Sequence, residues 1–251
     1  NPVFSLQESY GDFSSFFSAT TNELDSIQSL LADGFQVGNN IKVNGSTSDT
    51  FYYVAFGGTS APSGSGTFNM AVGTYTGNGT SQSISGLTFK PDLVIIKNNT
   101  TQQSVFKTRL MGSDSTAYLA SATANTEAGI TSLNNAGFSV GNVATVNTSG
   151  NTYQWQAFGN AYNPHTNSGA SDFAIGAYYG NAIDGRNIAR LSNTFDYVVI
   201  KSFSAAGAAT WRTSSMVGDL SSFFANTAEA ANSIQALGTN NFNIGTSANT
   251  N

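Results

Sequence analysis

The sequence predicts an all-β protein built from tandem, jelly-roll-like β-sandwich modules. Three observations support this fold class. A block of about 103 residues recurs along the 251-residue chain. Within each block, short runs of alternating apolar and polar residues are separated by Gly- and Asn-rich turns. Charged residues make up only 9% of the chain, against roughly 25% in an ordinary soluble domain, and aromatic residues are abundant.

The repeat divides the chain into three modules. Phe4 matches Phe106, so residues 1–57 correspond to the back half of a module whose front half is missing. Residues 67–159 form a complete module, and residues 171–251 form a module without its last strand. Since half-modules leave apolar surface and strand edges uncovered, we expect residues 1–251 to be a segment of a larger protein. The Gly/Ser/Asn-rich stretches at 57–66 and 159–171 are expected to be linkers.

Strands can be placed in order along the complete module. Alternation predicts the first strand at 68–72, and Gly77-Asn78-Gly79 predicts a turn. The continuous apolar run at 93–96 is typical of a strand that is buried on both faces. Residues 122–133 have weak helical spacing. The remaining expected strands are at 81–84, 106–111, 138–140 and 153–158, and residues 51–56 take the place of 153–158 in the first module.

The sequences at 75–79, 84–87 and 90–97 carry a family resemblance. They resemble a β-sandwich repeat of very large predicted bacterial cell-surface proteins and of phage tail-associated and virion proteins. The resemblance implies an extracellular, non-enzymatic structural or adhesive array, with a phage virion or tail component as an alternative. It carries no catalytic residue across. The third copy departs from the pattern at 181–191, so a role of that turn is not expected in every copy.

The composition of the chain excludes several classes of partner and of chemistry. The net charge of −5 argues against nucleic acid, which requires a basic surface. No apolar run is long enough to cross a membrane. Because there is no cysteine, disulfides, thiolate zinc sites and cysteine nucleophiles are excluded. We therefore expect an extracellular or cell-surface location, or a virion surface, and no cofactor.

The residues that could carry chemistry have ordinary structural interpretations. His165 is the only histidine and stands in a predicted linker, so no Ser-His-Asp relay is expected. Asp12, Asp114 and Asp219 recur at one loop position, where each could supply a Ca²⁺ ligand or simply cap the loop. We expect loop capping, and no enzyme activity.

Glycan binding is the main functional alternative. Tyr75, Tyr178 and Tyr179 stand beside Gly-rich turns and could form an aromatic platform for a sugar. Recurring aromatics at matched strand positions are more often core residues, and Trp155 and Trp211 are expected to be of that kind.

Two further expectations concern the recurring lysines and the incomplete modules. Lys97 and Lys201 recur together with Asn44, Asn147 and Asn251. This set could form intramolecular isopeptide bonds, but we expect solvated lysines. The third module lacks a strand equivalent to 153–158, which loses two aromatic residues from one face. We expect flanking modules of the same chain, or neighbouring copies, to complete such modules by strand addition.

Overall fold

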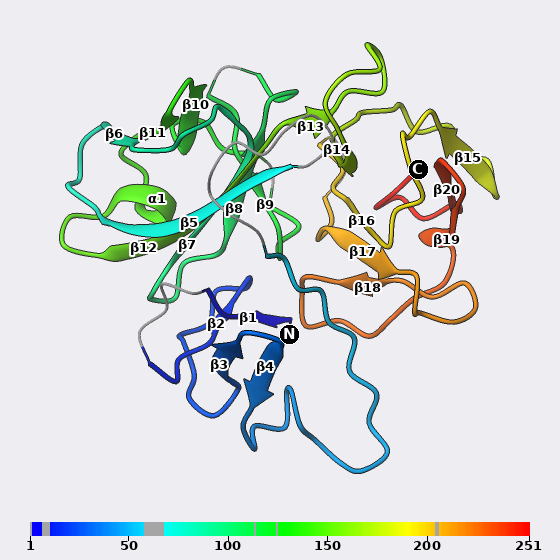
Figure 1. Ribbon diagram of the computed structural model, residues 1–251, viewed down its shortest axis with the longest axis horizontal. Helices are drawn as coiled ribbons and strands as arrows, with labels where there is room; N and C mark the ends of the chain where they lie inside the picture. The colour runs from blue at the N-terminus through cyan, green and yellow to red at the C-terminus, as the bar shows by residue number, and fades with distance from the viewer. Residues whose placement is uncertain (1, 7–10, 58–67, 113, 124, 204–205) are drawn as a thin grey trace.

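The computed structural model describes residues 2–6, 11–57, 68–112, 114–123, 125–203 and 206–251. The fold is nearly all β, as predicted. Figure 1 shows three groups of strands around a common centre. We name them the N-terminal lobe (residues 2–57), the middle lobe (68–159) and the C-terminal lobe (172–251). None of the described helices is long and apolar enough to span a membrane.

The middle lobe contains two antiparallel sheets and one short helix. The helix is α1 (Ala144–Asn147). The larger sheet has the strand order β5 (Asn69–Thr76), β12 (Thr152–Gly159), β7 (Pro91–Asn98), β8 (Val105–Thr108) and β9 (Ala117–Tyr118). The smaller sheet has the order β10 (Ile130–Asn134), β11 (Gly137–Val140) and β6 (Gln82–Ser85). The last strand in the chain, β12, is therefore central in its sheet, where it pairs with β5 on one side and β7 on the other.

The two sheets of the middle lobe pack face to face. Val94 and Ile96 of β7 and Phe138 of β11 are fully buried in one apolar cluster with Tyr153 and Ala157 of β12. Because side chains alternate across a strand, the residues of β7 between these point to the opposite face. That opposite face is also partly buried, as the continuous apolar run predicts, because it lies towards the other lobes.

The C-terminal lobe has two three-stranded sheets. One has the order β15 (Arg186–Ala189), β20 (Asn241–Ile244) and β19 (Ile234–Gly238), and the other β16 (Tyr197–Ile200), β17 (Thr210–Thr213) and β18 (Ser222–Phe223). Ile234, Phe242 and Ile244 are the buried residues of its core, with Val198 and Ile200 of β16 packed against them.

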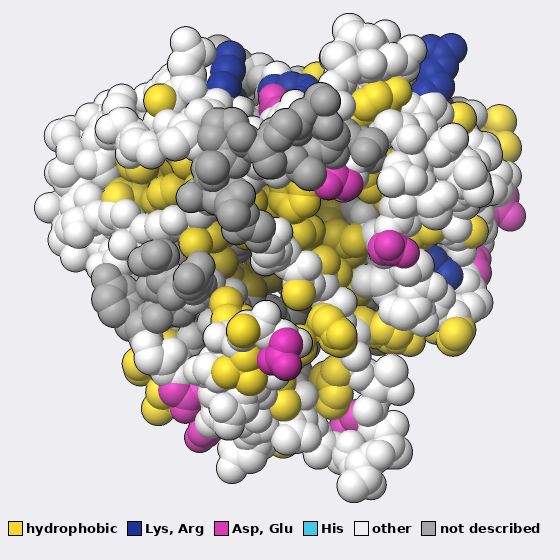
Figure 2. All heavy atoms as spheres, in the orientation of Figure 1, with side chains coloured by type: hydrophobic (Ala, Val, Ile, Leu, Met, Phe, Trp, Pro, Cys, Tyr) yellow, Lys and Arg dark blue, Asp and Glu magenta, His cyan; other side chains and the backbone are white. Residues whose placement is uncertain are grey.

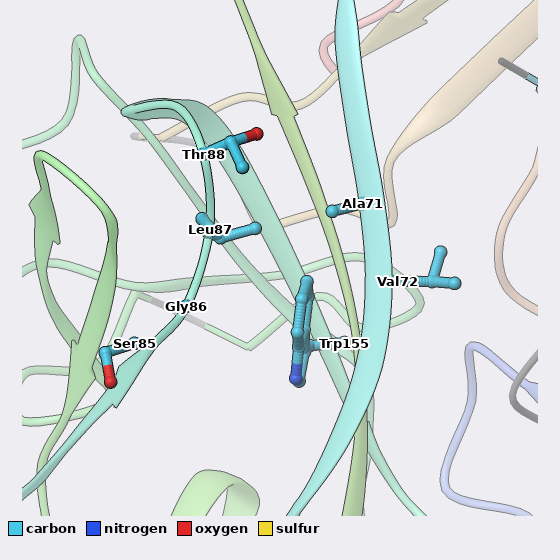
Figure 3. Close-up of a pocket in the computed structure, with 7 residues that line it drawn as sticks. All are labelled: Ala71, Val72, Ser85, Gly86, Leu87, Thr88 and Trp155. Carbon is cyan, nitrogen blue, oxygen red and sulfur yellow. The ribbon is translucent and has the colours of Figure 1, made fainter. Parts of the chain in front are cut away.

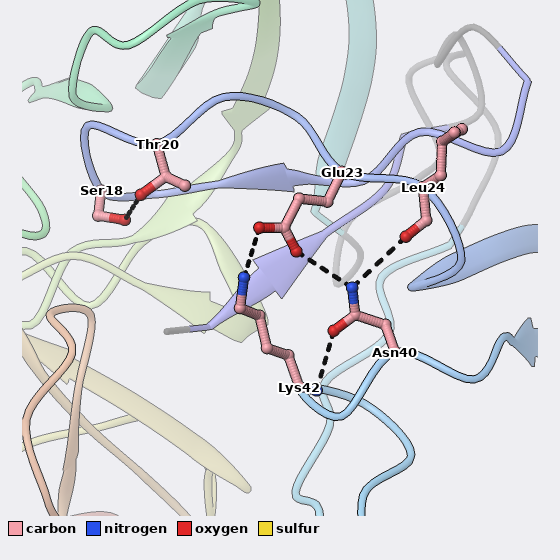
Figure 4. A network of polar contacts seen from close by, with 6 residues as sticks. All are labelled: Ser18, Thr20, Glu23, Leu24, Asn40 and Lys42. Atoms are coloured by element: carbon pink, nitrogen blue, oxygen red, sulfur yellow. Dashed lines mark hydrogen bonds and ion pairs between the residues drawn. The ribbon is translucent and has the colours of Figure 1, made fainter.

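The N-terminal lobe is smaller. β1 (Val3–Phe4) pairs with β2 (Ser15–Phe16), and β3 (Ile27–Leu31) pairs with β4 (Gly34–Val37). Figure 4 shows a polar network in this lobe, in which Lys42 pairs with Glu23 at 2.5 Å and Asn40 donates to the same carboxylate. The hydrogen bond from Lys42 lowers the pKa of Glu23. The Lys42 ammonium also lies 4.6 Å from the ring centre of the buried Phe16, so the network covers this ring.

The hairpins β3–β4, β10–β11 and β19–β20 share one latch. In each hairpin, the first residue is an isoleucine whose backbone is held by one side-chain hydroxyl. This hydroxyl accepts a hydrogen bond from the isoleucine N–H and donates one to the isoleucine carbonyl. The three pairs are Ser14 with Ile27, Thr116 with Ile130 and Ser221 with Ile234. Each hairpin also has a register shift immediately after that isoleucine.

A left-handed residue and a glycine accompany the latch. Asp25, Ala128 and Asn232 have φ between 57° and 60°. A Cβ added at the facing glycine would stand 2.3, 2.1 and 2.5 Å from their carbonyl oxygens, at Gly38, Gly141 and Gly245 respectively. Only glycine permits so close an approach, which explains this glycine in all three hairpins.

Three local expectations were wrong. The weak helical spacing at 122–133 corresponds to no helix among the described residues: Thr126 makes a β-bridge with Thr116, and β10 begins at Ile130. Residues 51–56 form no strand, although they match 153–158. The segment 159–171 is more than a linker, because β13 (Ala161–Tyr162) pairs with β14 (Ala170–Ala174). The predicted linker 57–66 lies, except for Gly57, outside the described residues.

Asn147→Ala is expected to lower the free energy of unfolding by about 2–3 kcal/mol, because several buried hydrogen bonds are lost together. The Asn147 side chain donates to the Gly141 and Thr80 carbonyls and accepts the Asn78 N–H at 2.8 Å, so it ties the turn after β5 to the loop after β11. Urea denaturation measures the loss. The matched Asn44 makes the Gly38 bond from an exposed position, and Asn44→Ala should cost less than about 1 kcal/mol. Equal losses in the two variants would contradict this account.

Candidate functional site

The three lobes meet at an apolar centre. Phe17, Leu119 and Phe224 each directly follow a two-residue strand, β2, β9 or β18. Leu119 and Phe224 are buried in one cluster, and Phe17 packs against it. The rings of Phe17 and Phe224 meet edge-to-face with their centres 4.8 Å apart. Figure 2 shows hydrophobic side chains gathered in the middle of this face, between the lobes. The three lobes are therefore packed against one another through this cluster.

The same backbone link joins successive lobes. The Ser104 N–H of the middle lobe donates to the Phe17 carbonyl of the N-terminal lobe at 2.9 Å. The Ala209 N–H of the C-terminal lobe donates to the Leu119 carbonyl of the middle lobe at 2.8 Å. Ser104 and Ala209 occupy matched positions, as do Phe17 and Leu119. Each lobe thus binds the preceding lobe in the same way.

The recurring lysines strengthen these junctions. Lys97 is only 1% exposed, and its Nζ donates to the Thr100 and Gln102 carbonyls at 2.9 and 2.5 Å and to the Thr20 carbonyl of the N-terminal lobe at 3.5 Å. Lys201 donates to Gly207 of its own lobe and to Ser121 of the middle lobe. The expectation that Lys97 is solvated was wrong: it lies on the side of β7 that faces the other lobes.

Burial lowers the pKa of Lys97 to about 8, because a charged ammonium is poorly solvated away from water. Burial also lowers the pKa of Lys201. Within the described part of the chain neither lysine is paired with an asparagine: the Asn147 amide binds Gly141 and the Asn251 amide binds Gly245. The lysines therefore act here as donors that bind carbonyl groups from two lobes.

A side-chain pair adds to the junction between the N-terminal and middle lobes. The buried Ser15 hydroxyl lies within hydrogen-bond distance of two side-chain oxygens, Gln154 Oε1 of β12 at 3.1 Å and Asn22 Oδ1 of its own lobe at 2.9 Å. Gln154 is 5% exposed, so this contact places two polar side chains at a buried position between the lobes. The same lobe contact thus combines apolar packing with specific hydrogen bonds.

The structure places the predicted Ca²⁺ residues apart from one another. Asp12, Asp114 and Asp219 lie in different lobes, and no group of three His, Cys, Asp or Glu side chains suited to a metal occurs among the described residues. Loop carbonyls that could act as ligands instead accept hydrogen bonds from β8 and β17. Lys107 donates to Gly112 and Ser115 at 2.6 and 2.9 Å, and Arg212 donates to Met216 and Gly218 at 3.0 and 2.7 Å.

The aspartates of these loops lie near those cations. Desolvation lowers the pKa of Lys107 and Arg212, while Asp114 and Asp219 respectively oppose the shift. Asp219 Oδ2 also accepts the Asn232 N–H at 3.2 Å. The loops that follow β8 and β17 are therefore each closed around a positively charged side chain, Lys107 or Arg212.

The three tyrosines considered for glycans differ in position. Tyr75 stacks on Tyr153 with ring centres 5.1 Å apart, and its hydroxyl donates to the Val146 carbonyl at 2.5 Å. Tyr178 donates to the Thr250 carbonyl, and burial raises its pKa to about 12. Only Tyr179, which is 93% exposed, presents a ring to solvent. The structure thus does not join the three into one platform.

A shallow recess of about 280 Å³ lies at the edge of the middle lobe. Figure 3 shows the Trp155 ring standing between the β5 backbone at Ala71 and Val72 and the loop after β6 at Leu87 and Thr88. Trp155 Nε1 is buried and has no partner among the described residues. No titratable side chain lines the recess, so the hydroxyl groups of Ser85 and Thr88 have no general base beside them among its lining residues.

The remaining predicted residues have structural contacts. His165 is exposed in the turn between Asn163 and Ser168. Asp92 accepts the Ala161 N–H at 2.8 Å and pairs with Arg109 at 3.2 Å. Arg109 also donates to the carbonyls of Ala161 and Tyr162, so this pair holds the segment that leads from the middle lobe to the C-terminal lobe.

Sequence reasoning missed the junction between the lobes, although one signal was present. Leu93, Ile95 and Lys97 alternate on one face of β7, so a lysine in an apolar row pointed to a buried donor.

No curated protein and no solved structure matches the chain. Residues 64–251, which cover the middle and C-terminal lobes, match the family described as Domain of unknown function (DUF7483), and the chain therefore belongs to that family.

Proposed function

We propose that the chain is a non-enzymatic structural array of tandem, jelly-roll-like β-sandwich modules with a period of about 103 residues. Its modules act by binding one another, in an extracellular surface protein or a virion. The observation that carries this proposal is the repeated junction, in which matched N–H groups of two lobes donate to matched carbonyls of the preceding lobe.

The chemistry of the junction supports a structural role. The contact buries aromatic and aliphatic side chains at its centre, and the Lys97 ammonium donates to carbonyl groups of both lobes, as in stable protein interfaces with an apolar core and specific hydrogen bonds. By contrast, the recess at Trp155 offers no titratable group. The low charge and many polar, turn-forming residues suit an exposed, extracellular setting.

Immunogold electron microscopy tests the proposal. Antibodies raised against residues 1–251 should label the outer surface of the source cell, or a phage particle. Labelling of particles would select the virion alternative over the cell surface. Labelling confined to the cell interior would overturn the proposed role.

Glycan binding remains the second candidate, and the exposed ring of Tyr179 is the observation that favours it, because an exposed aromatic face can stack on a sugar. A glycan array with the intact chain separates the two functions. Binding to a defined glycan that Tyr179→Ala abolishes would establish the lectin function. We expect no such binding.

A further inference from the structure

A single row of backbone hydrogen bonds runs through all three lobes at the apolar centre. The Phe17 carbonyl accepts the Ser104 N–H at 2.9 Å, and the Ser104 carbonyl accepts the Leu119 N–H at 3.2 Å. The Leu119 carbonyl in turn accepts the Ala209 N–H at 2.8 Å, and the Ala209 carbonyl accepts the Phe224 N–H at 3.1 Å. The row thus begins in the N-terminal lobe, crosses the middle lobe and ends in the C-terminal lobe.

The two ends of this row lie next to each other. Phe17 and Phe224 are its first and last residues, and their ring centres are 4.8 Å apart. The three lobes therefore form a closed group around the centre (Figure 1), and the contact does not continue outward as it does in a filament. The N-terminal lobe consequently sits in a site with two walls, one from the middle lobe and one from the C-terminal lobe. This site holds one lobe.

The wall from the middle lobe recognises mainly the backbone of its occupant. It donates to the Phe17 carbonyl at 2.9 Å and, from Lys97, to the Thr20 carbonyl at 3.5 Å. Gln154 adds one side-chain contact, with Ser15. The middle lobe is held on the C-terminal lobe through a matched carbonyl in the same way. Recognition therefore depends on the shape of a lobe and on the positions of its carbonyls, and a covalent connection is not part of it.

The wall from the C-terminal lobe lacks the backbone bond. Residue 2 matches Ser104 and Ala209, whose N–H groups join the other lobes. It is a proline, which has no N–H. The ring contact between Phe17 and Phe224 therefore stands at this wall without the bond that accompanies it elsewhere. The N-terminal lobe is bonded through its backbone to one wall only, which makes it easier to release than the middle lobe.

The connection to the N-terminal lobe is also the looser of the two. The segment 159–171, which leads to the C-terminal lobe, is fixed by the pairing of β13 with β14 and by Arg109, which donates to two of its carbonyls. Residues 46–50 are exposed and form no strand. Their described hydrogen bonds are made within this short segment. The contacts at the walls, and not residues 46–50, thus hold the N-terminal lobe in its site.

We propose that the site between the middle and C-terminal lobes binds the N-terminal lobe of a second copy of the chain in the same way as its own. The partner of this surface is then another copy, and two copies that exchange lobes reciprocally leave no site empty. The inference rests on the proposed structural role and deepens it, because it names which surface joins one chain to the next.

A single cut in the connection tests the proposal on the whole protein. A protease recognition sequence replaces residues 46–50, and the folded chain is cut there. Two such preparations, one of them isotopically labelled, are mixed and followed by native mass spectrometry. We expect the N-terminal lobe to stay bound after the cut, one for each remaining chain. Labelled lobes should then appear on unlabelled chains until the hybrids reach their statistical share, because mass action no longer favours the original partner.

Substitutions on both sides of the contact show that this site is the one used. Phe17→Asp places a charge of the lobe at the apolar centre and should raise the dissociation constant at least about 100-fold. Lys97→Met changes the site and leaves the lobe intact, and it should raise the same constant at least about tenfold. Val217→Asp is the matched control, because Val217 is 72% exposed in the C-terminal lobe, and it should leave the constant unchanged.

Three results would contradict the proposal. The lobe could fall away from the cut wild type, which would mean that the connection holds it. Complexes could persist without forming hybrids, which would mean that a second copy is not accepted. Lobes could bind equally well to the Lys97→Met and wild-type chains, which would place the contact elsewhere. None of these results would alter the labelling expected in the immunogold experiment, so the proposed role is tested separately.

Discussion

Phe224→Ala should destabilise the protein by about 3–5 kcal/mol, the usual cost of removing a buried aromatic side chain. Phe224 is 6% exposed and lies where all three lobes meet. Its ring contacts Phe17 of the N-terminal lobe and joins the cluster that contains Leu119 of the middle lobe. The cavity cannot be closed by one lobe alone, because its walls belong to three. Guanidinium denaturation followed by tryptophan fluorescence measures the change.

Phe203→Ala is the control for this substitution. Phe203 belongs to the same lobe but is 52% exposed, so its loss should cost less than about 1 kcal/mol. If Phe224→Ala cost no more than Phe203→Ala, the apolar centre would not hold the lobes together.

Lys97→Met should lower the free energy of unfolding at neutral pH by about 2–4 kcal/mol, because buried carbonyl groups lose their hydrogen-bond donor. The Thr100 and Gln102 carbonyls depend on this ammonium, and the Thr20 carbonyl links it to the N-terminal lobe. Lys90→Met removes an exposed lysine just before β7 and serves as the control. Urea denaturation of both variants gives the comparison.

The pH dependence of the same pair of proteins separates the ammonium from simple packing. Lys97 has a pKa of about 8 in the folded chain against 10.5 as the ordinary value. Between these values the unfolded chain binds more protons, so wild-type stability should rise with pH by up to about 1.4 kcal/mol per unit. Lys97→Met lacks this contribution, and the difference between the two proteins should widen above pH 8. A constant difference across that window would show that Lys97 is not desolvated.

The strands were predictable because their signals are local. Alternation at 68–72 and the apolar run at 93–96 record which faces are buried, and β5 and β7 formed there. The absence of a strand at 51–56 has a cause that is not local. Its sequence favours a strand as strongly as 153–158, but a strand also requires a neighbour, and no local pattern says whether the neighbour is present.

The candidate site was less predictable, because it depends on contacts between distant segments. The Phe17 and Leu119 carbonyls act as acceptors, and a backbone group leaves no trace in the residue type. Tyr75 and Tyr178 were considered for glycans because of the turns beside them, whereas their hydroxyls bind the carbonyls of Val146 and Thr250, which lie over seventy residues away in the sequence.

The position of β12 also sets the order in which the protein can form during synthesis. The strand that completes the larger sheet of the middle lobe is the last to leave the ribosome, since residues 99–151 separate it from β7. At about 5–20 residues per second, β5 waits several seconds for its only partner. The nascent module therefore passes through a stage in which its central gap is open. During that interval the facing edges of β5 and β7 are unpaired and open to any strand of the same pattern.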